Sequence, residues 1–361
     1  MIQLSKRYDY AIPVCAGLLI VFGLMFIHSA SCSESAPSPY IGKQLLWAAI
    51  GLLGLLILAH LDYRHIGTLA PFLYAAALVL LVAVLYLSAP LRGARSWLSL
   101  GPVSFQPSEF AKLAIIAVLA KFLSGFHRHR ERLWFMAVPL LIVLLPVFLI
   151  LEQPDLGSAL ILMPVLFSML YVSGVKPRYL AFVFLLALLS LPVLWMFLRP
   201  YQQARLRIFI NPGLDPMGLG YNAIQSKVAV GSGGFFGNGW LHGAQTHLKF
   251  LPERHTDFIF SVIGEEWGFA GGVVVIGLFM IIIFRGFGIA AQARDPFGRL
   301  LAVGVVVMLA AYVMINAGMT IGLMPITGLP FPLVSYGGSS LITALLSIGV
   351  LEGVRAKRYA Y

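Results

Sequence analysis

A single carboxylate, Asp257, stands where a polar stretch of the sequence meets an apolar one. Residues 251–268 read LPERHTDFIFSVIGEEWG, and the polar part ends at Asp257. A carboxylate in this position can act as a general base that takes a proton from a substrate hydroxyl. An acid kept beside an apolar membrane helix is by default a functional candidate. The alternative is that Asp257 only caps the following helix, as Asp often does, and the residues alone leave both interpretations open.

The residues after Asp257 favour close approach to its side chain. If a helix begins at Phe258, the step of about 100° per residue places Ser261, Gly264 and Gly268 near the face that carries Asp257. Such small residues let a neighbouring helix or a substrate come near the carboxylate.

Basic residues dominate the long segment that precedes Asp257. Residues 199–257 form a connection much longer than the usual 4–6 residues or so, which is typical of functional loops. Short interfacial helices are expected at 204–210 and 221–230. The glycine run 231–239 lacks the strand and the Lys-Ser/Thr of phosphate-binding motifs, so a flexible hinge is favoured. The basic residues of the long loop that are candidates for binding an anionic substrate are Arg205, Arg207, Lys227 and Lys249.

Four more charged residues lie inside or beside apolar segments. Glu109 and Lys112 are three residues apart on a predicted helix, which favours a structural ion pair, with contact between Lys112 and a phosphate as the second interpretation. Asp155 lies in a tight turn, where capping of a helix is favoured over a role as a metal ligand or second catalytic carboxylate in the cavity of Asp257. Glu265 is expected to pair with a neighbouring helix.

The composition identifies a membrane protein. Of the 361 residues, 60% are hydrophobic and only 11% are charged, whereas soluble domains carry about 25% charged residues. The net charge of +11 suits anionic headgroups or a phosphate-bearing substrate. Nucleic acid is not an expected partner, because the basic residues are scattered between apolar segments. The loop histidines, His242, His247 and His255, match no zinc spacing.

Ten apolar segments of about 20 residues predict ten membrane-spanning helices. The expected fold is therefore an all-α polytopic membrane protein, a single domain over residues 1–361, with the long loop between helices seven and eight. The predicted spans are 8–30, 41–61, 66–89, 107–125, 133–151, 156–174, 178–198, 258–284, 297–323 and 335–354.

The distribution of Lys and Arg predicts the orientation, since basic residues concentrate in cytoplasmic loops. The short loops on one side hold only three, Lys43, Arg92 and Arg95. Both termini are therefore expected in the cytoplasm and the loop 199–257 outside the cytoplasmic membrane. The other side holds fifteen: Lys6, Arg7, Arg64, Lys121, Arg128, Arg130, Arg132, Lys176, Arg178, Arg285, Arg294, Arg299, Arg355, Lys357 and Arg358.

Residues 322–340 are too rich in proline and polar residues to form one helix. Irregular backbone at membrane depth is tolerated where it lines a cavity. Hydroxyls and open N–H groups at its end make Ser335 and Gly337 candidates for substrate contact.

The chain resembles the SEDS (shape, elongation, division, sporulation) family over nearly all ten segments. Arg254, which precedes His255-Thr256-Asp257, is more typical of the elongation branch. Ser96 departs from the pattern, because the family usually has a second basic residue there. The motifs that carry the resemblance are GARSW at 93–97, QPSE at 106–109, EQPDLG at 152–157, NP at 211–212, GYN at 220–222, QS at 225–226, PERHTDFIF at 252–260 and SYGG at 335–338.

This resemblance implies a peptidoglycan glycosyltransferase that polymerises lipid II outside the membrane. It also implies a class B penicillin-binding protein and other elongation-complex membrane proteins as partners. Asp257 fits the general base, and a divalent cation, Mg²⁺ or Mn²⁺, on the pyrophosphate is compatible with this chemistry. Two rival classes stay open: a lipid II flippase, which broken helices favour, and a scaffold, which leaves the acid and the basic loop unexplained.

Overall fold

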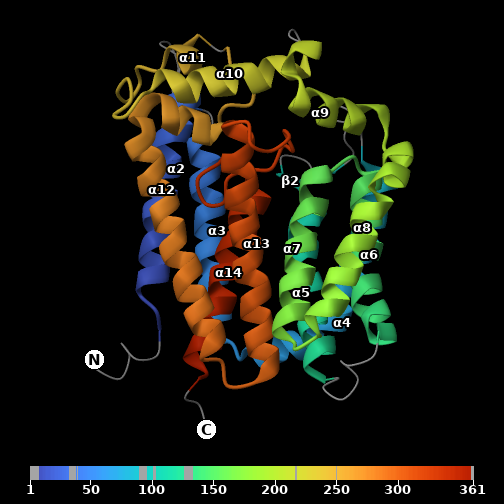
Figure 1. Cartoon of the computed structure of the whole chain (residues 1–361). Coiled ribbons are helices and arrows are strands. Elements are labelled where there is room, and N and C mark those ends of the chain that lie inside the picture. The colour runs from blue at the N-terminus through green and yellow to red at the C-terminus, as the bar shows by residue number, and fades with distance from the viewer. Residues whose placement is uncertain are drawn as a thin grey trace.

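The computed structural model describes residues 8–31, 38, 40–88, 96–100, 103–125, 133–215, 218–248 and 250–358. Long helices run side by side along one axis, and shorter helices cross one end of the bundle (Figure 1). We call that end, which carries α9, α10 and α11, the loop end. The opposite end, where α2 starts and α14 finishes, is the terminal end.

A helix occupies each of the ten predicted spans, although several bounds differ. The helix after the long loop continues to residue 291, beyond the predicted end at 284, and the last helix starts at Gly338 rather than 335. The ten helices are α2 Ala11–Ser31, α3 Ile41–His60, α4 Tyr63–Leu87, α5 Pro107–Gly125, α6 Ala137–Glu152, α7 Leu156–Val172, α8 Pro177–Phe197, α12 Ile259–Ala291, α13 Pro296–Thr320 and α14 Gly338–Ala356.

Six of these helices are long and apolar enough to cross a membrane by length and composition, namely α2, α3, α4, α12, α13 and α14. The apolar helices α6 and α7 are shorter, as is the apolar part Pro177–Ser190 of α8. The helix α5 carries Glu109, Lys112 and Lys121. The polytopic, helical fold is confirmed, and the number of ten crossings stays a prediction.

The long loop contains the expected helices, but each is longer than predicted. The 3₁₀ turn η3 Pro212–Leu214 joins α9 Pro200–Ile210 to α10 Leu219–Ser232, and α11 Ala244–His247 follows. A second 3₁₀ turn, η2 Leu133–Met136, precedes α6.

A small β-hairpin departs from the all-α expectation. Strand β1, Leu98–Leu100, pairs antiparallel with β2, Val103–Phe105. Strands of three residues are too short to produce a readable alternation of polar and apolar side chains. The hairpin leads directly into α5 and thereby sets where that helix begins.

Glycines bring the helices of the core into close contact. A Cβ on Gly349 of α14 would lie 2.8 Å from the Leu55 backbone of α3, and a Cβ on Gly51 of α3 would lie 2.5 Å from the Leu345 side chain. A side chain at Gly349 would require the backbone of α3 to move, whereas at Gly51 the end of the Leu345 side chain would have to shift. The nearly fully buried α13 packs against α12, α7 and α5 and forms the centre of the bundle.

The outer surface of the bundle is apolar. None of the described side chains of α8 is buried, and α3 exposes Leu46, Leu53 and Ile57. Apolar helix faces of this extent are typical of contact with lipid. The bundle therefore has the surface that the composition predicts for a membrane protein.

The basic asymmetry of the loops predicts which end faces outward. With Cys15 and Cys32 replaced by Ser, a cysteine at the exposed Asn238 should react with a membrane-impermeant thiol reagent in intact cells. A cysteine at Lys357 should react only after permeabilisation, since Lys and Arg favour the cytoplasmic side. The reverse labelling pattern would overturn the orientation.

Candidate active site

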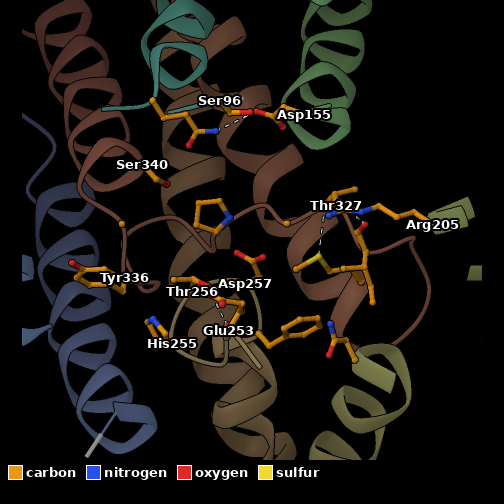
Figure 2. Close-up of a pocket in the computed structure, with 18 of the residues that line it drawn as sticks. Ser96, Asp155, Arg205, Glu253, His255, Thr256, Asp257, Thr327, Tyr336 and Ser340 are labelled. Carbon is orange, nitrogen blue, oxygen red and sulfur yellow. Dashed lines mark hydrogen bonds between the residues drawn. The ribbon is translucent and has the colours of Figure 1, made fainter. Parts of the chain in front are cut away.

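A cavity of about 680 Å³ lies at the loop end of the bundle. Its wall combines parts of α3, α9 and α10 with two irregular segments. We call residues 251–258, which precede α12, the acidic turn, and residues 321–337, which join α13 to α14, the proline loop. Figure 2 shows Asp257 among side chains of α9, the acidic turn and the proline loop.

Asp257 lines this cavity from the acidic turn. Its backbone N–H donates to the Glu253 carbonyl at 3.1 Å, and its own carbonyl accepts from the Asn316 side chain at 2.9 Å. The N-cap of α12 is Phe258, and no side chain makes a capping hydrogen bond there. Asp257 is therefore not the N-cap residue of α12, and it lines the cavity instead.

Gly328 of the proline loop lies close to both Asp257 and Arg205. Its φ is +74°, and a Cβ added to it would lie 3.4 Å from Oδ2 of Asp257 and 3.9 Å from Nη1 of Arg205. Arg205 also donates to the Ile326 carbonyl at 3.1 Å. A guanidinium thus stands in the same part of the cavity as the carboxylate.

Helical spacing decides which arginine of α9 faces the cavity. Arg205, Ile208 and Phe209 line it, as residues three and four apart on one helix face do. Arg207 is exposed and lies 5.7 Å from the centre of the Trp195 ring. The prediction that Arg207 lines the substrate site is therefore wrong, because two residues along a helix turn the side chain by about 200°.

Lys227 of α10 joins Arg205 in the cavity wall. A Cβ on Gly322, whose φ is +82°, would lie 1.9 Å from Cε of Lys227. The positive φ favours glycine at this position, and the absence of a side chain leaves room for Lys227 beside the proline loop. The fourth basic candidate, Lys249, lies outside the described residues.

The two candidates near α14 differ in their roles. Gly337 lines the cavity, and its N–H donates to Oε1 of Gln44 at 3.3 Å. Ser335 is buried and does not line the cavity, since its hydroxyl donates to the Thr256 carbonyl. The Gln44 amide also donates to the Ser335 carbonyl at 3.0 Å. Ser335 is thus a structural residue that holds the acidic turn, contrary to its prediction as a substrate contact.

Lys112 lies outside the cavity and is completely buried. Its Nζ donates to Oε1 of Glu109 at 2.9 Å and to the Ser158 hydroxyl at 3.2 Å. The other oxygen of Glu109 accepts from the Tyr312 hydroxyl at 2.6 Å. The structural ion pair with Glu109 is confirmed, and substrate contact by Lys112 is wrong because protein groups already take up its ammonium.

Asp155 caps a helix, as one of its two predicted roles requires, and it also lies in the cavity wall. Oδ1 accepts from the Ser158 N–H at 3.0 Å and caps α7, while Oδ2 accepts from Gln106 and from Ser108, both at 3.2 Å. The residue also lines the cavity. With these donors around it, Asp155 is better placed to organise the wall than to take a proton.

Glu265 of α12 holds the long loop in place. Its carboxylate accepts from the backbone N–H groups of Gln245 at 2.7 Å and Thr246 at 3.1 Å. A Cβ on Gly233 or Gly237 would lie 1.9 or 2.1 Å from backbone oxygens of α12. Close packing against α12 therefore accounts for Gly233 and Gly237, whereas Gly231 and Gly234 meet nothing within 4 Å.

The small residues after Asp257 contact a helix of the loop. The Ser261 and Ser226 hydroxyls are 2.7 Å apart, and a Cβ on Gly264 would lie 3.2 Å from Val230 of α10. Gly268, with φ +65°, fits against the glycine run. Close approach is confirmed, but to α10 rather than to a substrate.

The sequence did not reveal the aromatic part of the cavity wall. His255, Tyr336 and Trp47 line it, and the Tyr40 ring stacks on His255 at 4.5 Å. Burial, with a smaller contribution from Tyr40, raises the pKa of the Tyr336 phenol, which therefore stays protonated at neutral pH. These residues come from three distant segments, so no local spacing could have indicated them.

Within the described part of the chain, no group of three His, Cys, Asp or Glu side chains is arranged to hold a metal ion. Mg²⁺ is often bound by one or two carboxylates together with substrate phosphates. A cation in this cavity would therefore take most of its ligands from the substrate.

Comparison with known proteins assigns the family. A family model described as "Cell cycle protein", which covers the FtsW, RodA and SpoVE proteins, matches residues 9–360. The peptidoglycan glycosyltransferase MrdB of Escherichia coli K12 is 39% identical over 94% of this chain and 93% of its own. The stage V sporulation protein E of Bacillus subtilis is 39% identical over 97% of this chain and 98% of its own.

Solved structures agree with this assignment. The structure described as "Structural coordination of polymerization and crosslinking by a peptidoglycan synthase complex" contains a chain with a TM-score of 0.84 and 36% identity, covering 98% of this chain and 99% of that one. The crystal structure of the rod shape determining protein RodA of Thermus thermophilus gives a TM-score of 0.74 at 34% identity and covers 99% of both chains.

The buried ion pair beneath the cavity should be important for stability. Lys112→Met leaves the Glu109 carboxylate buried without its cation, which costs about 3–5 kcal/mol, and should lower the thermal unfolding midpoint in detergent. The double variant Glu109→Gln with Lys112→Met removes both charges and should be clearly more stable than Lys112→Met alone. Equal destabilisation by the two variants would contradict this account.

Proposed function

Because the chain belongs to the SEDS family, we propose that it is a peptidoglycan glycosyltransferase that polymerises lipid II, a disaccharide-peptide linked to a lipid by a pyrophosphate. The observation that carries the proposal is the cavity at the loop end. It combines the Asp257 carboxylate with two cationic side chains, Arg205 and Lys227. We further propose that the cavity faces outward and that all ten helices span the cytoplasmic membrane, with both termini inside.

The reaction needs a base that deprotonates the acceptor hydroxyl and positive charge that stabilises the leaving pyrophosphate of the donor. Asp257 takes the proton from the acceptor hydroxyl as its oxygen bonds to the anomeric carbon of the donor sugar. The bond from that carbon to the pyrophosphate breaks, and the pyrophosphate leaves with the electron pair. Attack from the side opposite to the leaving group inverts the configuration. Arg205 and Lys227 stabilise the charge that develops on the pyrophosphate.

A divalent cation is compatible with this arrangement. Mg²⁺ or Mn²⁺ would be held mainly by the pyrophosphate oxygens, and it would neutralise charge on the leaving group.

The proposed partner is a class B penicillin-binding protein that crosslinks the glycan product, together with other membrane proteins of the elongation complex. The similarity to a chain from a complex that coordinates polymerization and crosslinking supports this partner. Similarity to MrdB of Escherichia coli and RodA of Treponema pallidum supports a role in cell elongation.

A lipid II flippase is the alternative, and it predicts transport without glycan synthesis. Alternating access needs substrate sites that open to both sides of the membrane. The large cavity described here lies at the loop end. Glycan strands made by the purified chain from lipid II would separate the two functions.

Asp257→Asn should abolish most of the polymerase activity. Loss of a general base costs about 10²–10⁴ in rate, while Asn preserves the shape of the side chain, so the unfolding midpoint should change little. Asp62→Asn is the matched control, because Asp62 only caps α4 and Asn caps equally well. Strand synthesis is measured with purified protein, lipid II and the cognate penicillin-binding protein. Near-normal strand synthesis by Asp257→Asn would show that Asp257 is not the general base.

The two arginines of α9 provide an internal control for the charge on the leaving group. Arg205→Gln should lower the polymerisation rate by about 10²-fold or more, since it removes a donor from the developing pyrophosphate charge. Arg207→Gln makes the same chemical change on the exposed face of the same helix and should leave the rate within about twofold, as surface substitutions usually do. Equal losses in the two variants would argue against a specific role for Arg205.

A further inference from the structure

The cavity has two chemically different ends, and Asp257 lies between them. Figure 2 places Tyr336 and His255 on one side of Asp257 and Arg205 on the opposite side. We call these the aromatic end and the cationic end. The aromatic end is lined by Trp47, His255 and Tyr336, and the cationic end by Arg205, Phe209 and Lys227.

Three rings form one cluster at the aromatic end. The rings of Tyr40 and His255 stack with centroids 4.5 Å apart and an interplanar angle of 17°. The Tyr336 ring lies 4.7 Å from Tyr40 and 5.9 Å from His255. His255 and Tyr336 line the cavity, whereas Tyr40 supports them from behind and is not part of the lining.

Backbone contacts fix this cluster relative to Asp257. The Tyr336 N–H donates to the His255 carbonyl at 2.9 Å, and His255 is two residues before Asp257 in the acidic turn. The rings therefore form a rigid surface at a set place beside the carboxylate.

Such a surface suits a sugar. One face of a pyranose ring presents mainly C–H groups, which pack on aromatic rings as other apolar groups do. The hydroxyls at the edge of the sugar stay free to reach Asp257. The Tyr336 phenol, which stays protonated, can donate a hydrogen bond to a sugar oxygen.

The geometry of in-line displacement indicates whether the donor sugar or the acceptor sugar binds at the aromatic end. The attacking hydroxyl and the leaving group lie on opposite sides of the donor's anomeric carbon, and the base lies on the side of the attacking hydroxyl. The leaving pyrophosphate requires the cations, so the donor's phosphates belong at the cationic end. The acceptor sugar then belongs at the opposite, aromatic end.

The aromatic end also holds a cation for a second lipid-linked substrate. Lys43 lines the cavity and lies on α3, one helical turn before Trp47. An acceptor that carries its own pyrophosphate would find an ammonium there.

On the basis of the proposed glycosyltransferase function, we propose that His255 and Tyr336, supported by Tyr40, form the binding platform for the acceptor sugar. The cationic end around Arg205 and Lys227 binds the donor's pyrophosphate. The ring cluster thus orients the acceptor hydroxyl toward Asp257 and distinguishes the acceptor from the donor.

The test uses substrates that can act in only one role. A lipid-linked disaccharide whose accepting hydroxyl is capped serves only as donor. A phosphonate analogue, with carbon in place of the anomeric oxygen, cannot lose its pyrophosphate and serves only as acceptor. The full chain with its cognate penicillin-binding protein can then couple one donor to one acceptor in a single reaction. A KM is measured for the donor and for the acceptor.

Tyr336→Ala should raise the KM for the acceptor about five- to tenfold, as expected for the loss of an aromatic contact. It should change the KM for the donor less than about twofold. Tyr336→Phe keeps the ring and should keep most of the acceptor affinity. Phe209→Ala, at the cationic end, should show the opposite pattern and raise the donor KM. The backbone hydrogen bond of residue 336 survives all these changes.

A binding measurement separates this proposal from the proposed function. Tyr336→Ala should weaken binding of the phosphonate acceptor but not of a polyprenyl pyrophosphate that has no sugar. That difference would support the acceptor platform even if the wild-type chain failed to couple the two substrates. Failure to couple them would instead refute the proposed glycosyltransferase function. A raised donor KM in Tyr336→Ala, or equal binding of both ligands by the variant and the wild type, would overturn the platform.

Discussion

The buried side-chain amide of Asn316 is the contact on which the geometry of the cavity depends. It lies in α13 with 0% exposure and donates to the carbonyls of Asp257 at 2.9 Å and Leu329 at 2.6 Å. Both acceptors belong to irregular backbone, and carbonyls inside an apolar bundle need hydrogen-bond partners. One side chain therefore joins the acidic turn to the proline loop, so that Asp257 and the part of the cavity wall formed by the proline loop are positioned together.

The charged groups at the loop end are divided by burial into two kinds. Glu109 and Lys112 neutralise each other below the cavity, where a charge without a partner would be very costly. Arg205 and Lys227 lie instead in the cavity wall, where water or a substrate can reach them. The positive charge of the cavity thus comes from Arg205 and Lys227 of the long loop and from Lys43 of α3, and not from the buried ion pair.

The sequence predicted the helical frame well because membrane helices have a strong local signature, a long run of apolar residues. It predicted the helices of the long loop for a similar reason. It missed the hairpin of β1 and β2, whose short strands carry too little pattern. It also placed the start of α14 three residues early, because Ser335 and Tyr336 belong to a loop that is held by contacts with Gln44 and His255.

The sequence by itself determined the membrane class and the family and singled out Asp257 as a candidate base, since composition and motifs are properties of the chain alone. Only the tertiary structure decided which candidates share the cavity. In the structure Arg205 lines the cavity and Arg207 does not, and Lys112 is buried in the core. The ring cluster forms from residues at positions 40, 255 and 336. The physical reason is that a site made of distant segments depends on how helices pack and rotate against one another, and no local pattern of residues specifies that packing.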